Sequence, residues 1–239
     1  MTARRDDDSL VLRVGGHLRA PRAAGVAGLA FAVLYTTALV LLRTSPFIGA
    51  DSETIAAMAP GADDGLFIAT FYLFPFAGVA FLWFVAVARD QVDDRRDRFF
   101  AIVLAGSGEL FVALLFVAGA LSSAITLGMR YLGDGAPSAD QIGLMRSMTY
   151  ALLFIFGSRA AGIFLVSFST VAYRTRALPR WLALPGFLIG LALMFVVTAW
   201  DWVILVLPAW VAIVSVGILV LQRRARRAAP AGGADPAPA

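Results

Sequence analysis

Residues 99–127 read FFAIVLAGSGELFVALLFVAGALSSAITL, and this stretch carries a single charged side chain, Glu109. A helix of about 20 residues is long enough to cross a hydrocarbon core of about 30 Å. In lipid the backbone amides must bond within the protein, and a helix satisfies them by itself. The stretch therefore predicts a transmembrane helix with one acid inside it.

The rest of the chain repeats this composition in blocks. Of the 239 residues, 60% are hydrophobic and 15% are charged, whereas a soluble domain carries about 25% charged residues; the mean hydropathy is +0.81. Strand-like alternation is absent, which argues against a barrel. We predict an all-α, polytopic bundle of six transmembrane helices between a basic N-terminal segment, 1–22, and a basic, then disordered tail, 223–239. The predicted spans are 23–43, 65–88, 99–127, 149–172, 181–200 and 202–222.

The arginines predict the orientation of the chain. All 20 basic side chains are arginine, and cytoplasmic loops of membrane proteins are enriched in such residues. The side that we predict to be cytoplasmic carries Arg4, Arg5, Arg13, Arg19, Arg22, Arg89, Arg95, Arg96, Arg98, Arg174, Arg176, Arg180, Arg223, Arg224, Arg226 and Arg227. The opposite side carries only Arg43, Arg130 and Arg146. Both termini are therefore predicted to be cytoplasmic, in a multi-pass protein of the inner cell membrane.

The sequence lacks the residues and motifs that several kinds of catalytic and metal chemistry require. There is no cysteine, and the single histidine, His17, lies in the polar N-terminal segment. Nucleotide-binding, metalloprotease and hydrolase motifs are absent, so we predict no catalytic residue, metal or cofactor and lean against an enzyme. The pI of about 10.1 comes from arginines beside apolar blocks, which favours anionic lipid headgroups at the cytoplasmic face over nucleic acid.

Glu109 and Arg159 are the two charged residues that lie inside predicted spans. At 1.5 Å per residue, Glu109 lies about 16 Å from Arg98, and Arg159 lies about 22 Å from Arg174 on the same side. A pair between the third and fourth spans is therefore geometrically feasible. Two interpretations stay open. Either the pair bridges the helices, with Ser107 and Ser158 as additional donors, or the charges line a polar cavity for a substrate, proton or ion.

Proline and small residues indicate where the helices bend and pack. Pro75 falls inside the second span, where it removes a backbone bond, so a kink or hinge is expected there. Small residues four apart mark helix contacts in membranes. Gly157 and Ala161 have this spacing in the fourth span, and Gly186 and Gly190 in the fifth. These pairs fit either packing within the chain, which we favour, or the seam of a dimer.

Three segments carry a resemblance to a known group. They are FPFAGVAFLWFVAVARD (74–90), DRFFAIVLAGSGELFVALLF (97–116) and TRALPRWLALPGFLIGLAL (175–193), and LPRWLAL (178–184) is the most recognisable part. The chain resembles uncharacterised multi-pass membrane proteins of actinobacteria over most of residues 20–225. The resemblance implies fold and location, but no activity. It also implies an arginine at Arg159, in a setting like SRAAGIF, and an apolar residue in place of Glu109.

Three functions follow as hypotheses. The first is a non-enzymatic interaction, regulatory or accessory component of the membrane, with a second copy or another membrane protein as its partner. The second is a small transporter or channel-like protein with a cavity at Pro75, Glu109 and Arg159. The third, ranked last, is a membrane enzyme acting on a lipid. A continuous polar cavity that reaches Glu109 would separate the second hypothesis from the first.

The predicted threading is testable with reporter fusions. A reporter that is active only outside the cytoplasm should be active when joined after Asp63, which the arginine distribution places outside. The same reporter joined after Arg96 should be inactive. Activity after Arg96 with inactivity after Asp63 would contradict the orientation.

Overall fold

The computed structural model describes residues 3–45, 50–57, 64–90, 98–131, 137–175, 180–195 and 204–228. Within these residues every regular element is a helix, which confirms the all-α class. Five helices there are long and apolar enough to cross a membrane: Arg22–Thr44, Asp64–Asp90, Phe99–Tyr131, Ala139–Arg174 and Val206–Arg223. The segment predicted as the fifth span, 181–200, is a shorter apolar helix, Arg180–Phe195. Its last predicted residues, 196–200, lie outside the described ranges.

The N-terminal part contains one long helix and one short one. Helix α1 (Ala3–Thr44) runs without a break through the basic segment and the first span. Helix α3 (Ser52–Ala56) follows in the loop at the far end of the bundle. Its N-cap is Asp51, whose carboxylate accepts bonds from the backbone N–H of Thr54 (2.7 Å) and the Thr54 hydroxyl (3.0 Å). These hydrogen bonds favour the ionised carboxylate and hold the pKa of Asp51 below its ordinary value.

The second span changes its helical geometry just before Pro75. Helix α4 (Asp64–Ile68), the π-helical turn η1 (Ala69–Leu73) and helix α5 (Phe74–Asp90) follow one another without a gap. A proline ring clashes with the carbonyl of residue i−4, which here is Phe71, and proline has no N–H to give. A wider turn relieves both effects, and the N–H of Phe74 accordingly bonds the carbonyl of Ala69, five residues back. The irregularity expected at Pro75 thus takes the form of a π-helical turn.

The third and fourth spans form a long hairpin. Helix α6 (Arg98–Tyr131) comes first, and the returning helix consists of α7 (Ala139–Tyr150), the π-helical turn η4 (Ala151–Gly157) and α8 (Ser158–Arg174). Helix α7 begins with a capping box, in which Ser138 and Gln141 each bond the other's backbone N–H. The turn η4 contains no proline, and Gly157 is the residue that closes it. A Cβ at Gly157 would lie 2.9 Å from the carbonyl oxygen of Leu152 in the same turn.

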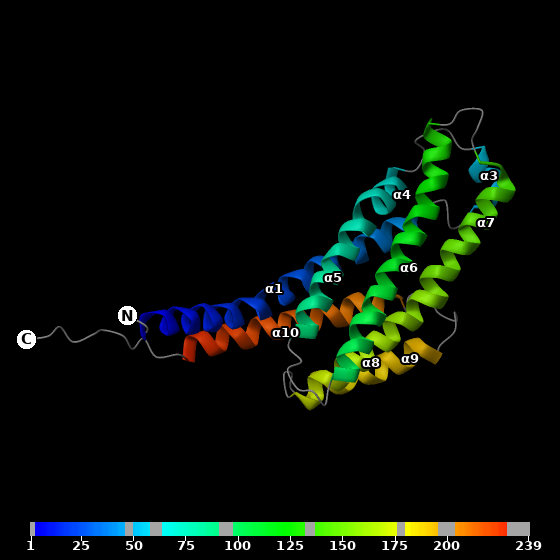
Figure 1. Cartoon of the computed structure of the whole chain (residues 1–239). Coiled ribbons are helices and arrows are strands. Elements are labelled where there is room, and N and C mark those ends of the chain that lie inside the picture. Colours follow the sequence, from blue (N-terminus) through cyan, green and yellow to red (C-terminus); the bar gives the residue numbers. More distant parts are fainter. Residues whose placement is uncertain are drawn as a thin grey trace, which may run out of the picture.

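The last two helices return along earlier ones. Helix α9 (Arg180–Phe195) packs antiparallel on α8, and helix α10 (Val206–Ala228) packs antiparallel on α1. Figure 1 shows the N-terminal part of α1 and the C-terminal end of α10 lying together, away from the other helices. The contact of α8 with α9 is closest at two glycines. A Cβ on Gly190 would lie 2.8 Å from the carbonyl oxygen of Gly162, so the two backbones touch there without side chains between them.

Aromatic rings fill the space between the helices. Phe31 of α1 lies 4.5 Å from Phe81 of α5, centroid to centroid, and Phe81 lies 5.0 Å from Phe164 of α8. The series continues to Phe168 and from there to Trp210 of α10, at 5.2 Å. Ring pairs at such distances add stabilisation beyond their buried area. This aromatic core joins α1, α5, α8 and α10 into one body.

The glycine contact between α8 and α9 predicts that replacing glycine by alanine changes the free energy of unfolding in opposite directions at Gly190 and Gly106. Gly190→Ala should lower the free energy of unfolding by about 1–3 kcal/mol, because the new Cβ meets a backbone carbonyl that cannot move aside easily. Gly106→Ala should instead raise it by up to about 1 kcal/mol, because alanine favours a helix and nothing lies within 4 Å of a Cβ there.

The measurement is unfolding of the purified chain in mixed micelles. Equal effects of the two substitutions would contradict the close approach of α8 and α9.

Candidate functional site

Arg159 finds its partner in its own helix. Its guanidinium is half-buried on α8, and Nη1 donates a hydrogen bond of 2.7 Å to the carbonyl oxygen of Ile155. Ile155 belongs to η4, and a π-helical turn disturbs the regular ladder of backbone bonds. The adjacent Ser158 behaves in the same way, because its hydroxyl donates to the carbonyl of Phe154 at 2.7 Å. The guanidinium of Arg159 is therefore held by a backbone carbonyl of η4.

Glu109 points the other way. Its side chain is exposed on α6, between the exposed residues Gly106 and Leu110. The opposite side of the same turn is buried, since Gly108 packs closely against Val85 of α5. Within the described part of the chain Glu109 makes no hydrogen bond and no ion pair. The carboxylate thus faces the surroundings of the bundle, on a helix that is long and apolar enough to cross a membrane.

The structure does not bring Glu109 and Arg159 together. Their depths agree with a pair, but a pair also requires both side chains to face the same helix–helix contact. On a helix each residue is rotated by about 100° from the next, and this rotation turns Glu109 outward while Gly108 faces inward. The expected helper Ser107 also bonds its own helix, donating to the carbonyl of Val103 at 2.7 Å.

Pro75 lines a small pocket that contains neither charge. The pocket has a volume of about 290 Å³ between η1, α5 and α6. Its lining residues are Thr70, Phe71, Phe74, Pro75, Phe116, Gly119, Ala120 and Ser123. The hydroxyl of Thr70 is already bonded to the carbonyl of Leu66. The pocket at Pro75 is therefore lined by neither Glu109 nor Arg159.

The small residues singled out in the sequence pack within the chain. Gly186 lies against Ser169 of α8 and the ring of Trp210, and Gly190 lies against Gly162. Ala161 is buried on α8, at 2% exposure. Gly157 serves η4, as described above. The structure therefore places Gly186 and Gly190 at the contact between α8 and α9.

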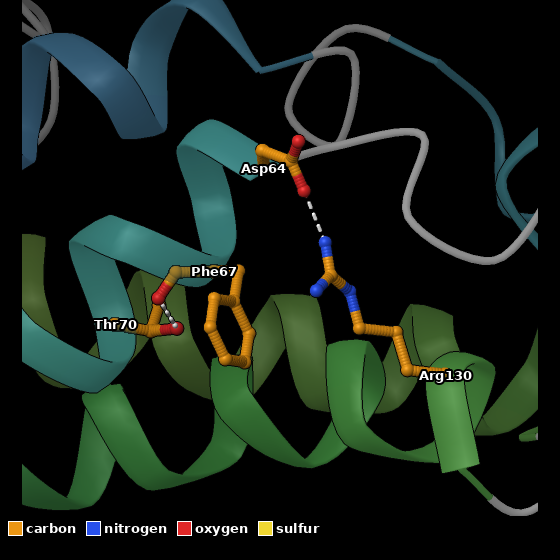
Figure 2. Close-up of polar contacts among 4 residues, drawn as sticks. All are labelled: Asp64, Phe67, Thr70 and Arg130. Atoms are coloured by element: carbon orange, nitrogen blue, oxygen red, sulfur yellow. Dashed lines mark hydrogen bonds and ion pairs between the residues drawn. The ribbon is translucent and has the colours of Figure 1, made fainter.

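The end of the bundle opposite the arginine clusters holds an ion pair. Figure 2 shows that Arg130, near the end of α6, reaches Asp64 at the start of α4. The same guanidinium lies 4.6 Å from the ring centroid of Phe67, in a cation–π contact. These contacts join α4 to α6 and explain one of the three arginines on this side.

The other two arginines of that side meet in a cavity. Arg43 lies in the last turn of α1, and Arg146 lies on α7, more than a hundred residues later. Both line a cavity of about 620 Å³. The other lining residues are Leu42, Ser52, Gly143, Ser147, Thr149, Tyr150, Ala151, Leu153, Phe154 and Ile155. Sequence reasoning counted Arg43 and Arg146 only as loop charges and missed this site. The available signal was that arginine is rare on this side, so each one there calls for a partner.

No group of metal ligands appears near these sites. Among the described residues no three His, Cys, Asp or Glu side chains gather where they could hold a metal ion. No family model, no curated protein and no solved structure matches the chain. The resemblance to actinobacterial membrane proteins therefore stays a prediction that rests on the quoted segments.

Proposed function

We propose that the chain is a six-span protein of the inner membrane with both termini in the cytoplasm. The antiparallel contact of α1 and α10 supports this count. Gly25 lies against Leu219, and Gly28 against Ser215, so the start of the first span and the end of the last share one end of the bundle. An even number of crossings returns the chain to the same end, and we count the shorter apolar helix α9 as the sixth beside the five longer ones. Its 16 residues extend about 24 Å.

We further propose that the protein is a non-enzymatic interaction component, and the outward carboxylate of Glu109 is the observation that carries this proposal. A charged side chain at the bilayer centre costs about 2.5–3.5 kcal/mol or more. Side chains that can donate a hydrogen bond find an acceptor within their own helix. Thr70, Ser158 and Arg159 all donate to carbonyls of the preceding turn. An ionised carboxylate can only accept hydrogen bonds. The backbone N–H groups of a helix interior are already used, so Glu109 needs a donor from outside its helix in order to stay ionised there.

The surface around Glu109 is shaped to receive a helix. We call it the lipid face of α6 and define it as Ile102, Gly106, Glu109, Leu110, Ala113 and Val117, which are all exposed. Gly106 leaves an open notch, with nothing within 4 Å of where a Cβ would lie. Small residues let a second helix approach closely, and a polar side chain in the contact then strengthens it.

Charge complementarity defines the partner. We propose a transmembrane helix of another membrane protein that carries Lys, Arg or His at the depth of Glu109. Such a side chain both donates to the carboxylate and neutralises it. This proposal ranks above a transporter or a lipid enzyme, because the pocket at Pro75 is lined by neither Glu109 nor Arg159 and Glu109 faces outward.

Photo-crosslinking from the lipid face of α6 tests the proposal. A photoreactive amino acid in place of Leu110 should capture another membrane protein in native membranes. The same amino acid in place of Val33 is the matched control, since Val33 is 64% exposed and lies eleven residues after Arg22, at the same depth of about 16 Å. It should capture no such protein. Mass spectrometry of the product should locate Lys, Arg or His within the captured transmembrane segment.

Substitution of Glu109 completes the test. Glu109→Leu should reduce the yield of the crosslink about tenfold, the loss expected for a charge-assisted hydrogen bond. Glu109→Gln should reduce it less, because the amide still forms hydrogen bonds. A product of twice the chain's own mass would identify a second copy and overturn the assignment to another protein. Equal capture from Leu110 and Val33 would overturn the interaction surface itself.

A further inference from the structure

The cavity at Arg43 and Arg146 lies at the boundary between lipid and water. Arg43 is 21 residues beyond Arg22 on α1, or about 32 Å along the helix. Ile155, on the cavity wall, is 19 residues before Arg174, or about 28 Å along its helix. The hydrocarbon core is about 30 Å thick, and the headgroups lie directly beyond it. The cavity therefore sits at headgroup depth, at the end of the bundle that the proposed topology places outside.

The charged side chains among the described residues of the cavity wall are both arginines. Arg43 and Arg146 are both half-buried, and no described residue of the lining is acidic. Arg146 donates through Nη1 to the carbonyl oxygen of Ala50 at 2.7 Å, and both arginines make further contacts within the protein. A guanidinium has five N–H donors, so contacts that fix its position leave others for a ligand. The preference for phosphate over neutral groups follows from this chemistry.

The deeper wall is apolar. Leu42, Leu153, Phe154 and Ile155 line the side toward the membrane, whereas Ser147 and Tyr150 are exposed nearer to the water. The volume of about 620 Å³ lies within the range of ligand pockets. An inorganic anion would use only the arginine end of this space. A molecule with an anionic head and an apolar tail would use both ends.

A side-chain hydrogen bond also supports the cavity wall. It includes part of η4, and π-helical turns occur often at functional sites. Arg159 bonds the carbonyl of Ile155, a residue of the lining. The half-buried Arg159 thus fixes the wall from one helical turn below and adds positive charge beneath it.

We infer that this cavity binds the headgroup and upper acyl chains of an anionic phospholipid from the outer leaflet. Arg43 and Arg146 bind the phosphate, and Leu153, Phe154 and Ile155 contact the chains. This site is separate from the lipid face of α6. It relies on the proposed topology only for the name of the leaflet.

Lipid retention by the purified full chain tests this assignment. The protein in mild non-ionic detergent is incubated with phosphatidylglycerol or with phosphatidylcholine, and native mass spectrometry counts the lipid bound per chain. One phosphatidylglycerol should be retained and phosphatidylcholine released. The double variant Arg43→Gln/Arg146→Gln should retain phosphatidylglycerol about tenfold less or weaker still, because two charge-assisted contacts are lost. Arg89→Gln/Arg180→Gln, which removes two exposed arginines at the opposite end, should retain it within about twofold.

A second variant keeps the test independent of the arginines' structural contacts. Ser147→Trp fills the cavity from an exposed position and keeps both guanidinium groups, and it should cause the same loss of lipid. An excess of inorganic phosphate should not displace the bound lipid. Displacement by phosphate would assign the cavity to a free anion instead. Retention of phosphatidylcholine as strongly as phosphatidylglycerol, or unchanged retention in both cavity variants, would overturn the site.

Discussion

A helix in lipid offers side chains only one kind of spare hydrogen-bonding group, the carbonyl oxygen of its own backbone. Donors can use it. Thr70, Ser107, Ser158 and Thr170 all donate to a carbonyl four residues earlier, and Arg159 does the same at η4. An ionised carboxylate has nothing to donate. This asymmetry gives Arg159 an acceptor within its own helix and leaves an ionised Glu109 in need of another molecule, and it connects the fold to the proposed function.

The same constraint explains why the bundle packs as it does. Helices in lipid gain little from burying apolar surface against each other, so they depend on close contact and on ring packing. The α8–α9 contact at Gly162 and Gly190 supplies the close contact, and the rings from Phe31 to Trp210 supply the ring packing. A cavity remains at the end of the bundle opposite the arginine clusters, where Arg43 and Arg146 line its wall.

The positions of the spans were predictable from the sequence, whereas the direction of Glu109, the turn η4 and the cavity were not. Span positions follow from local composition, and the depths of Glu109 and Arg159 follow from helical rise alone. The direction in which Glu109 faces depends on how α6 is rotated against α5 and α8, and apolar residues surround α6 on every side, so periodicity could not decide it. The turn η1 is explained by Pro75, but η4 has no such marker. The cavity joins residues more than a hundred positions apart, which no local pattern reveals.

The central claim is that Glu109 is covered by another protein in the native membrane. A hydrophobic carbodiimide such as dicyclohexylcarbodiimide reaches carboxyl groups from the lipid phase and modifies them in their protonated form. Its reaction with Glu109, located by peptide mass spectrometry against the Glu109→Gln variant, measures that cover directly. Glu109 should be modified in the purified chain, where its side chain is exposed, and protected in native membranes. Equal modification in both settings would contradict the claim.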